Sequence, residues 1–181
     1  MLDLGAYSGL TSILFAKAVG PTGRVIAVEP DPLTLASCRV NIAAAALPQL
    51  SLEEVAVAAA PGTVQLSSEG ATGSAFVSLV GRHRGEIVDV EAITLDGLMR
   101  RSGLDQVHFI KMDIEGAEMS VLPASLELLK RHRPRLILEP HRVDGKSTAD
   151  AIKAMLEGVG YRCDTIAQHG FNSLPLLTAT P

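Results

Sequence analysis

Residues 1–10 read MLDLGAYSGL, and this stretch decides the fold. The apolar run over 1–4 predicts a buried strand, and Gly5 predicts a turn at its end. Ser8 predicts the N-terminal cap of a helix that runs to about residue 19. A strand, a glycine turn and a helix together form the usual cradle for a nucleotide-like ligand. We predict that the inner face of this helix is made by Leu10, Ile13, Leu14 and Ala18.

The alternation of strand and helix continues to residue 57. The β-branched run over 24–29 ends at Pro30 and predicts a second strand. Asp31 followed by Pro32 predicts a helix N-terminus, and this helix is expected to reach about residue 46. A third strand is predicted over 52–57. Short apolar strands that alternate with helices are typical of a parallel sheet with helices on both faces.

The middle of the chain breaks this order, and the C-terminal half restores it. A small β-rich insertion is predicted around 62–93, with extended segments at 63–66, 76–79 and 86–93. Helices are then predicted over 95–101, 117–130 and, capped by Ser147, 147–158. Strands are predicted over 107–112, 135–138, 161–167 and 174–178, and the last two are expected to form a hairpin through 169–172. The pattern predicts one α/β domain, 1–181, on a doubly wound, mostly parallel, seven-stranded sheet.

The composition argues against several classes of protein. The chain has 181 residues, a net charge of -4, 3% aromatic residues and no Trp. The negative charge argues against a phosphate-backbone partner, and the scarcity of aromatic residues argues against a stacking surface for single-stranded nucleic acid. No apolar run reaches the ~18 residues of a transmembrane helix. Cys38 and Cys163 are expected to be reduced core thiols. We expect a cytoplasmic protein that binds neither nucleic acid nor a membrane.

The first glycine loop fits two ligands, a nicotinamide dinucleotide and S-adenosylmethionine. For either ligand, Glu29 at the end of the second strand can accept both hydroxyls of a ribose. The dinucleotide fingerprint G-x-G-x-x-G needs a second glycine to make room for a pyrophosphate, and here Tyr7 stands at that position. S-adenosylmethionine has no phosphate, and its ammonium group favours a nearby carboxylate such as Asp3. Alone, the loop leaves both ligands open, as well as a plain tight turn made by Gly5 and Gly9.

Residues 109–118, FIKMDIEGAE, carry the most specific pattern in the chain. An apolar strand delivers Asp113, Glu115 and Glu118 at a strand-to-helix turn. The dipole of the following helix accounts for both glutamates without any chemical role. Asp113 ends a central strand and is expected to face the same crevice as Gly5. Clustered carboxylates can also bind a divalent cation, but we assign no metal ligand from the sequence.

Six segments in the same order resemble the FkbM-type methyltransferases. They are residues 3–9 (DLGAYSG), 28–32 (VEPDP), 41–42 (NI), 94–96 (TLD), 111–118 (KMDIEGAE) and 139–141 (EPH). The resemblance implies a class I, Rossmann-like fold that uses S-adenosylmethionine, most often to methylate a hydroxyl on a sugar or natural-product molecule. The family's first loop usually reads D-x-G-A-N-x-G, and here Tyr7 replaces the asparagine. Family members usually carry structure before the first strand, so we expect this chain to start late, either truncated at its N-terminus or naturally minimal.

From the glycine loop and this resemblance we predict two groups of site residues, cofactor contacts and catalytic residues. The expected cofactor contacts come from the first loop, the end of the second strand and the fourth strand: Asp3, Gly5, Ala6, Tyr7, Gly9, Glu29, Pro30 and Asp113. Methylation of an alcohol also needs a group that takes its proton. His141 and Asp113 are the candidates, because a histidine ordinarily titrates near neutral pH and Asp113 ends the neighbouring strand. Glu139 is expected to orient His141 or to bind substrate.

Two other functions remain as alternatives. An NAD-dependent oxidoreductase shares the sheet and the ribose-binding acid, but Tyr7 and the carboxylates of 113–118 count against it. A non-catalytic remnant that no longer binds the cofactor fits the altered loop. For an enzyme, we expect a small-molecule acceptor whose pocket is shaped by residues 62–91. An apolar patch left uncovered beside the first strand would favour a homodimer.

Overall fold

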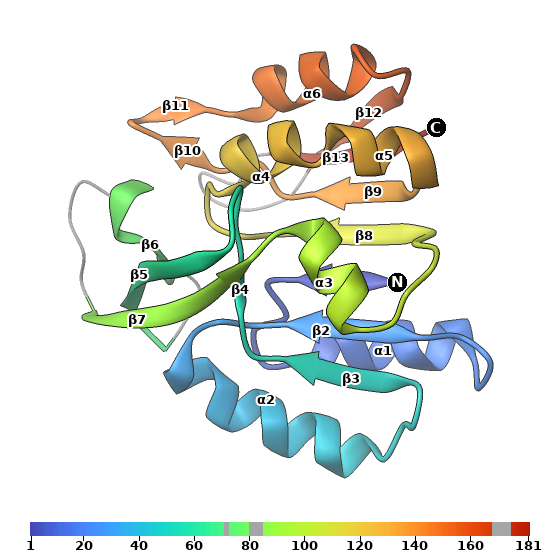
Figure 1. Cartoon of the computed structure of the whole chain (residues 1–181). Helices are drawn as coiled ribbons and strands as arrows, with labels where there is room; N and C mark the ends of the chain where they lie inside the picture. Colours follow the sequence, from blue (N-terminus) through green and yellow to red (C-terminus); the bar gives the residue numbers. More distant parts are fainter. Residues whose placement is uncertain (71–72, 80–84, 168–174) are drawn as a thin grey trace.

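The main sheet runs through the centre of the molecule (Figure 1). The computed structural model describes residues 1–70, 73–79, 85–167 and 175–181. The sheet has seven strands in the order β12-β13-β9-β8-β1-β2-β3. They are β1 (Leu2–Leu4), β2 (Val25–Val28), β3 (Leu50–Glu53), β8 (Phe109–Met112), β9 (Arg135–Leu138), β12 (Arg162–Ile166) and β13 (Leu176–Thr180). Neighbouring strands are parallel, except that β13 pairs antiparallel with both β9 and β12. The predicted doubly wound, mostly parallel sheet is confirmed.

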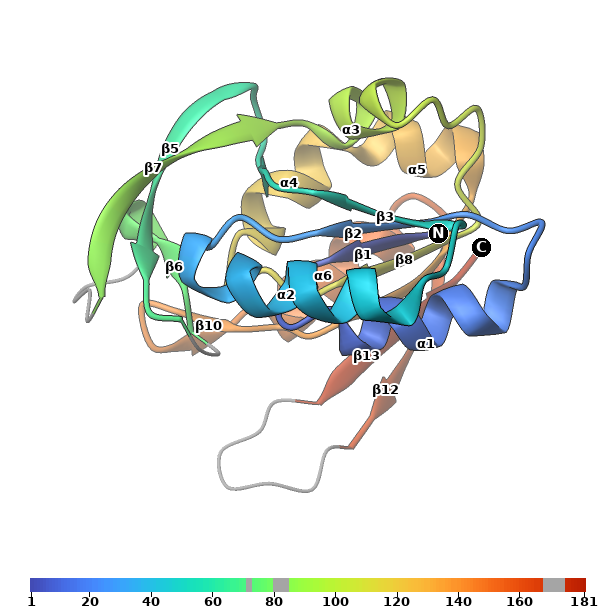
Figure 2. The same ribbon diagram turned by 90° about the horizontal axis from the view of Figure 1, so that it is seen from below.

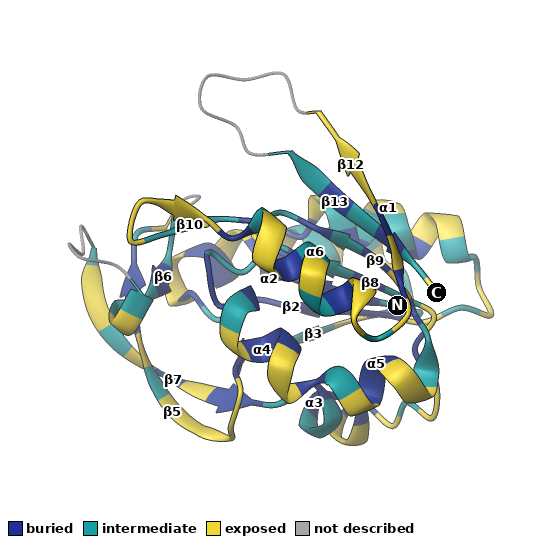
Figure 3. Ribbon diagram, turned by 90° about the horizontal axis from the view of Figure 1, so that it is seen from above, coloured by how far each residue is buried: buried dark blue, intermediate teal, exposed yellow. Residues whose placement is uncertain are grey.

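Helices cover both faces of this sheet. They are α1 (Leu10–Val19), α2 (Pro32–Ala45), α3 (Leu95–Arg101), α4 (Glu118–Ala124), α5 (Leu126–His132) and α6 (Ala149–Glu157). Figure 2 shows α1 and α2 on one face and α3, α4 and α5 on the other. Successive strand side chains point to opposite faces, so Leu2 and Leu4 enter the larger core with α3 to α6, whereas Val25 and Ala27 pack against α1. Every residue of β1 and β2 is therefore buried. Buried residues are dark blue in Figure 3.

A second, smaller sheet lies beside the ends of the parallel strands (Figure 1). Its strand order is β4-β7-β5-β6. The strands are β4 (Ala56–Val57), β5 (Gly62–Ser68), β6 (Ala75–Phe76) and β7 (Glu86–Ile93), with a 3-10 turn over Val77–Leu79. The hydroxyls of Ser68 and Ser74 both donate to the carboxylate of Asp31, which links this sheet to the start of α2. The predicted β-rich insertion around 62–93 is confirmed, but the extended segment predicted over 76–79 is wrong beyond Phe76, because Val77–Leu79 form the 3-10 turn.

Two elements that the sequence predicts as continuous are divided in the structure. The strand predicted over 52–57 ends at Glu53, and β4 leaves the main sheet to pair with β7. The helix predicted over 117–130 forms α4 and α5, with a break at Ser125. Pro123 has no N–H to donate and its ring crowds the preceding turn, so the helix ends just after it. The apolar pattern runs through both breaks and gives no sign of them.

The predicted inner face of α1 is right at Ile13, which packs against the core, and wrong at Leu10, Leu14 and Ala18, which are exposed. Leu10 and Leu14 are 60% and 65% exposed, whereas Ser12 and Ala16 are fully buried. The helix is apolar on nearly every side, so periodicity could not indicate which face is inside. Ser12 is buried because its hydroxyl donates to Asp3, and the small Ala16 permits close approach to the sheet. Leu10 and Leu14 leave an exposed apolar surface, and the expected homodimer stays a prediction.

The N-termini of two helices, α1 and α6, also differ from the prediction. Gly9, not Ser8, precedes α1, and no side chain caps that helix. Before α6, Thr148 occupies the N-cap position, although the Ser147 hydroxyl still accepts a hydrogen bond from the Ala149 amide at 3.2 Å. A short hairpin of β10 (Arg142–Val143) and β11 (Lys146–Ser147) precedes it and was not predicted. The antiparallel pairing of β12 with β13 was predicted; its expected turn, 169–172, lies outside the described residues.

Two further expectations concern the cysteines and the membrane. Cys38 and Cys163 are both buried and free, as expected for core thiols. Within the described ranges, the helices are too short or too polar to span a bilayer.

Candidate functional site

Two pockets at the ends of the parallel strands share Gly5, Tyr7 and Asp113 in their walls. The first pocket is also lined by Glu29, Glu115 and a set of mainly apolar residues: Leu4, Val28, Pro30, Val55, Val57, Leu66 and Phe76. The second is lined by Ala6, Glu139 and further residues from α1 and β9. Of the predicted site residues, Asp3, Gly9 and His141 line neither pocket. The structure therefore gathers most, but not all, of the predicted set in one place.

Gly5 is the point at which the first loop touches the neighbouring strand. Its φ is +78°, and a Cβ built on it would lie 1.8 Å from the carbonyl oxygen of Asp113. On the other side, the amides of Gly5 and Ala6 both donate to the carbonyl of Val28 at 3.0 Å. The loop is held between the ends of β2 and β8, so only glycine fits this position. The close approach that requires glycine here is to the chain's own backbone.

Asp3 and Lys111 form a buried ionic connection beneath the loop. Asp3 is fully buried, and its Oδ2 accepts a hydrogen bond from the Ser12 hydroxyl at 2.6 Å. Lys111 Nζ lies 3.3 Å from Asp3 Oδ1 and donates to the Gly5 carbonyl at 2.6 Å. Burial raises the pKa of Asp3, and Lys111 and Ser12 act against that rise. The predicted contact of Asp3 with a cofactor ammonium group stays a prediction, because the structure places Asp3 under the loop.

Lys111 also contacts the site itself, at 3.4 Å from Asp113 Oδ2. The sequence reasoning assigned it no role. The pairing of β1 with β8 could have suggested one, because it sets Asp3 directly beside Lys111 in register.

Glu29 lies in the wall of the first pocket and is 7% exposed. Its two carboxylate oxygens accept hydrogen bonds from the backbone amides of Tyr7, at 2.8 Å, and Asp31, at 2.9 Å. Burial raises the pKa of Glu29 to about 7, because it outweighs the two amide donors that lower it. Each oxygen keeps a lone pair that can accept a further hydroxyl from the pocket.

Gly9 serves the packing of the two helices behind the loop. Its φ is +79°, and a Cβ there would lie 3.1 Å from Cys38 and from Ile42, both on α2. The Asn41 side chain on the same helix donates to the Ser8 carbonyl at 2.9 Å. The predicted contact between Gly9 and a cofactor stays a prediction, and the structure gives this glycine a different reason to be small.

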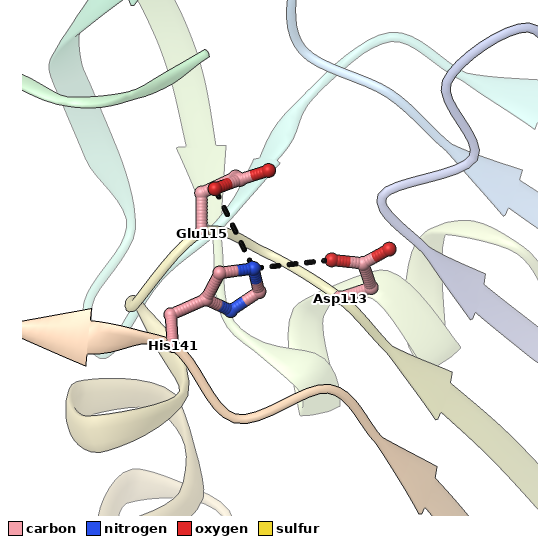
Figure 4. Close-up of side chains that lie close together, drawn as sticks. All are labelled: Asp113, Glu115 and His141. Carbon is pink, nitrogen blue, oxygen red and sulfur yellow. Dashed lines mark ion pairs between the residues drawn. The ribbon is translucent and has the colours of Figure 1, made fainter. Parts of the chain in front are cut away.

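Three carboxylates lie close to His141, and Figure 4 shows two of them, Asp113 and Glu115. His141 Nε2 lies 3.5 Å from Asp113 Oδ1 and 3.4 Å from Glu115 Oε2. On the other side of the ring, Nδ1 lies 3.2 Å from Oε1 of Glu118, which is fully buried and also accepts the Ile114 amide. Glu118, which the sequence explained by the helix dipole alone, is thus the group that orients His141. Glu139 lines the second pocket.

The surroundings of His141 change its expected chemistry. Burial alone would lower its pKa, but the hydrogen bond to Glu118 and the charges of Glu118, Glu115 and Asp113 raise the pKa to about 9. A histidine with an ordinary pKa would titrate near neutral pH, as expected from the residue type. The pKa of His141 lies above this near-neutral value, and the role of His141 as general base stays a prediction.

The sequence of the site matches one family. A family model described as the methyltransferase FkbM domain matches residues 3–163. The chain belongs to the FkbM methyltransferase family. The match includes the glycine loop, Glu29 and the carboxylates around His141, so the site described above lies within the FkbM domain.

Several known proteins are similar to this FkbM chain. The 2-O-methyltransferase NoeI of Sinorhizobium fredii is 27% identical over 148 residues, which are 74% of this chain and 60% of that protein. A crystal structure of methyltransferase FkbM from Methylobacillus flagellatus KT has a TM-score of 0.68 and 18% identity, over 99% of this chain and 42% of that one. Aeropyrum pernix fibrillarin, solved with natively bound S-adenosyl-L-methionine, has a TM-score of 0.62 and 13% identity, over 99% of this chain and 65% of that one.

These similarities establish the fold and show how much of its relative the chain covers. The architecture is that of the class I methyltransferases, as the sequence predicted. The chain spans about 60% of the length of the curated relative that it matches.

Tyr7, which replaces the usual asparagine of the FkbM loop, is expected to lower the free energy of unfolding through backbone strain. Tyr7 has a φ of 51°, a left-handed conformation that asparagine, the usual family residue there, adopts more easily than tyrosine. We expect Tyr7→Asn to raise the free energy of unfolding by about 0.5–1 kcal/mol, and the melting temperature by about 2–4 °C. Thermal denaturation measures this. Tyr7→Phe keeps the strain and is expected to melt with the parent chain; an asparagine variant no more stable than Tyr7→Phe would contradict the prediction.

Proposed function

We propose that this chain binds S-adenosylmethionine in the first pocket and methylates a hydroxyl of a small molecule such as a sugar. The observation that carries the proposal is the place of Asp113, which lies in the walls of both pockets. One pocket offers a ribose-binding carboxylate, and the other offers Glu139 beside the same aspartate. When bound, the cofactor would supply an electrophilic methyl group; the residues of the chain supply binding, orientation and charge.

The first pocket fits an adenosine group. Glu29 can accept the two ribose hydroxyls, and the apolar side chains of Pro30, Val55 and Phe76 offer a surface for an adenine ring. Gly5 keeps the loop in contact with β8 and thus sets the position of the pocket wall. A dinucleotide suits this site less well, because Tyr7 stands where a pyrophosphate needs a glycine.

The proposed hydroxyl acceptor is supported by a relative's name and by two carboxylates in the second pocket. NoeI, the curated relative, is named a 2-O-methyltransferase, which supports an oxygen acceptor for this chain. Asp113 and Glu139 both line the second pocket and can accept hydrogen bonds from hydroxyls there. We propose that these two carboxylates face the acceptor, and that His141, whose Nε2 lies 3.5 Å from Asp113 Oδ1, holds Asp113 in place.

Calorimetric titration with S-adenosylhomocysteine tests the cofactor assignment. We expect binding that Glu29→Gln weakens by about 10- to 100-fold, because two hydroxyls lose a charged hydrogen-bond partner. NAD is the control ligand and is expected to give no heat. A parent chain that melts cooperatively but binds no S-adenosylhomocysteine would favour the non-catalytic alternative.

The pKa of Glu29 predicts how this affinity changes with pH. Below about pH 7 the free chain holds Glu29 protonated, and a ligand whose hydroxyls need the carboxylate must first displace that proton. We therefore expect the affinity for S-adenosylhomocysteine to rise by about tenfold between about pH 6 and pH 8. Glu29→Gln should remove this dependence. Equal pH profiles for the parent and the variant would show that Glu29 does not hold the ligand.

The acceptor class needs an activity assay. The purified chain is incubated with labelled S-adenosylmethionine and a panel of simple glycosides, and mass spectrometry locates the new methyl group. We expect O-methylated product with at least one sugar, and a loss of about 100-fold or more in Asp113→Asn. Binding of S-adenosylhomocysteine without transfer to any hydroxylated compound would overturn the proposed sugar acceptor.

A further inference from the structure

Three potential metal ligands converge at the junction of the two pockets. Nε2 of His141 and one oxygen each of Asp113 and Glu115 all lie within 4.8 Å of one another. The two distances from the imidazole nitrogen are 3.4 Å and 3.5 Å. Neighbouring ligands around a tetrahedral ion bound at about 2.0 Å are about 3.3 Å apart. Across the described ranges, this is the one group of three or more such side chains that converges in this way.

Neighbouring side chains orient two of these ligands, His141 and Asp113, in the way that is usual for metal ligands. A histidine that binds a metal usually gives its other ring nitrogen to a carboxylate, which sets its tautomer and its direction. His141 Nδ1 lies 3.2 Å from Glu118, so a neutral ring would turn the lone pair of Nε2 toward Asp113 and Glu115. Lys111 lies 3.4 Å from Oδ2 of Asp113, and Oδ1 is the oxygen that faces His141.

Glu118 supplies a second, independent sign of a missing positive charge. Its side chain is fully buried and points into the cluster through Oε1, while Oε2 has no hydrogen-bond partner. A buried carboxylate with an unpaired oxygen is costly unless a positive charge compensates it. Asp113 and Glu115 add two more carboxylates around one imidazole. The three carboxylates thus share one imidazole and Lys111, which is itself shared with Asp3.

We propose that Asp113, Glu115 and His141 bind one divalent transition-metal ion, such as Mn²⁺ or Zn²⁺. One imidazole and two carboxylates form a donor set that suits these ions better than Ca²⁺, which takes oxygen ligands alone. Asp113 and Glu115 line the first pocket, and Asp113 also lines the second, so a ligand in either pocket would reach the ion. In a consequence that rests on the proposed function, the ion would hold a hydroxyl oxygen of the acceptor.

Binding of Mn²⁺ to the purified chain, followed by electron paramagnetic resonance, tests the proposal without cofactor or acceptor. We expect one Mn²⁺ per chain, with the affinity reduced at least tenfold in each of Glu115→Gln, Asp113→Asn and His141→Ala. Glu118→Gln keeps all three ligands and is expected to weaken binding by about 10- to 100-fold at unchanged stoichiometry, as expected for a positioning residue. Calorimetry with Zn²⁺ repeats the comparison for the second ion.

Matched controls come from outside the cluster. His108 is exposed and Glu127 is exposed on α5, so His108→Ala and Glu127→Gln should bind Mn²⁺ as the parent does. Every variant is first checked for cooperative melting, and the isosteric Glu115→Gln decides the test if His141→Ala does not fold. No binding of either ion, or binding that Glu115→Gln leaves unchanged, would overturn the metal site. Loss of S-adenosylhomocysteine binding beside intact Mn²⁺ binding would overturn the proposed function alone.

Discussion

Gly5→Ala is expected to lower the free energy of unfolding by about 2–5 kcal/mol. A Cβ at Gly5 would lie 1.8 Å from the carbonyl oxygen of Asp113, so the loop or the end of β8 must move. Overpacking of this kind costs about 1–3 kcal/mol, and the φ of +78° adds about 1–2 kcal/mol for any residue other than glycine. Thermal denaturation should show a melting temperature lower by about 10 °C.

Gly103→Ala separates the clash from the strain. Gly103 has a φ of +60°, is exposed, and a Cβ there would meet nothing closer than an Arg24 nitrogen at 3.9 Å. In this variant the free energy of unfolding is expected to fall by only about 1 kcal/mol, the contribution of backbone strain at positive φ. If both alanine variants melt at the same temperature, the Asp113 carbonyl can move away from a Cβ at residue 5 without loss of stability. The first loop would then not be held tightly against the end of β8. The surviving Gly5→Ala chain would then be tested for S-adenosylhomocysteine binding.

The order of the elements could be predicted from the sequence because each strand and helix carries its own signal. Asp31 accepts a hydrogen bond from the Leu33 amide and Pro32 begins α2, as their types suggested. The inner face of α1 could not be predicted, because it depends on tertiary contacts: Ser12 is drawn inward by Asp3, which lies on another element. The division at Ser125, in contrast, follows Pro123, a signal that the sequence carries but that the continuous apolar pattern outweighed in the prediction.

The candidate site could be predicted only as separate parts. Residues at the ends of neighbouring parallel strands meet, so the sequence could place Gly5, Glu29 and Asp113 together. The partner of His141 could not be predicted, because Glu118 reaches it from the start of α4, across 23 positions of the chain. Burial would lower the pKa of His141, but this contact and the charges of Glu115 and Asp113 raise it to about 9, which no local pattern reveals. The residue type alone therefore gave too low a pKa for His141, and its role as a base stays a prediction.

Lys111→Met is expected to lower the free energy of unfolding by about 3–5 kcal/mol. The Lys111 ammonium group lies among Asp3, Asp113 and the carbonyl of Gly5, and its removal leaves the fully buried carboxylate of Asp3 without a cation. Breaking a buried ion pair from one side costs this much because the remaining charge stays desolvated. Urea denaturation of the parent and the variant measures the difference. Lys130→Met removes an exposed pair with Glu127 and should cost no more than about 0.5 kcal/mol.

A second substitution at Asp3 identifies the origin of this loss. Asp3→Asn removes the charge but keeps an oxygen that can accept the Ser12 hydroxyl. In the parent it should destabilise the fold, because Lys111 loses its partner. In Lys111→Met it should instead restore part of the lost stability, because no buried charge then remains at Asp3. Losses that simply add in the double variant would mean that Lys111 acts mainly through Gly5 and Asp113. In that case the lysine would hold the loop against the candidate site, and the carboxylate beneath the loop would not depend on it.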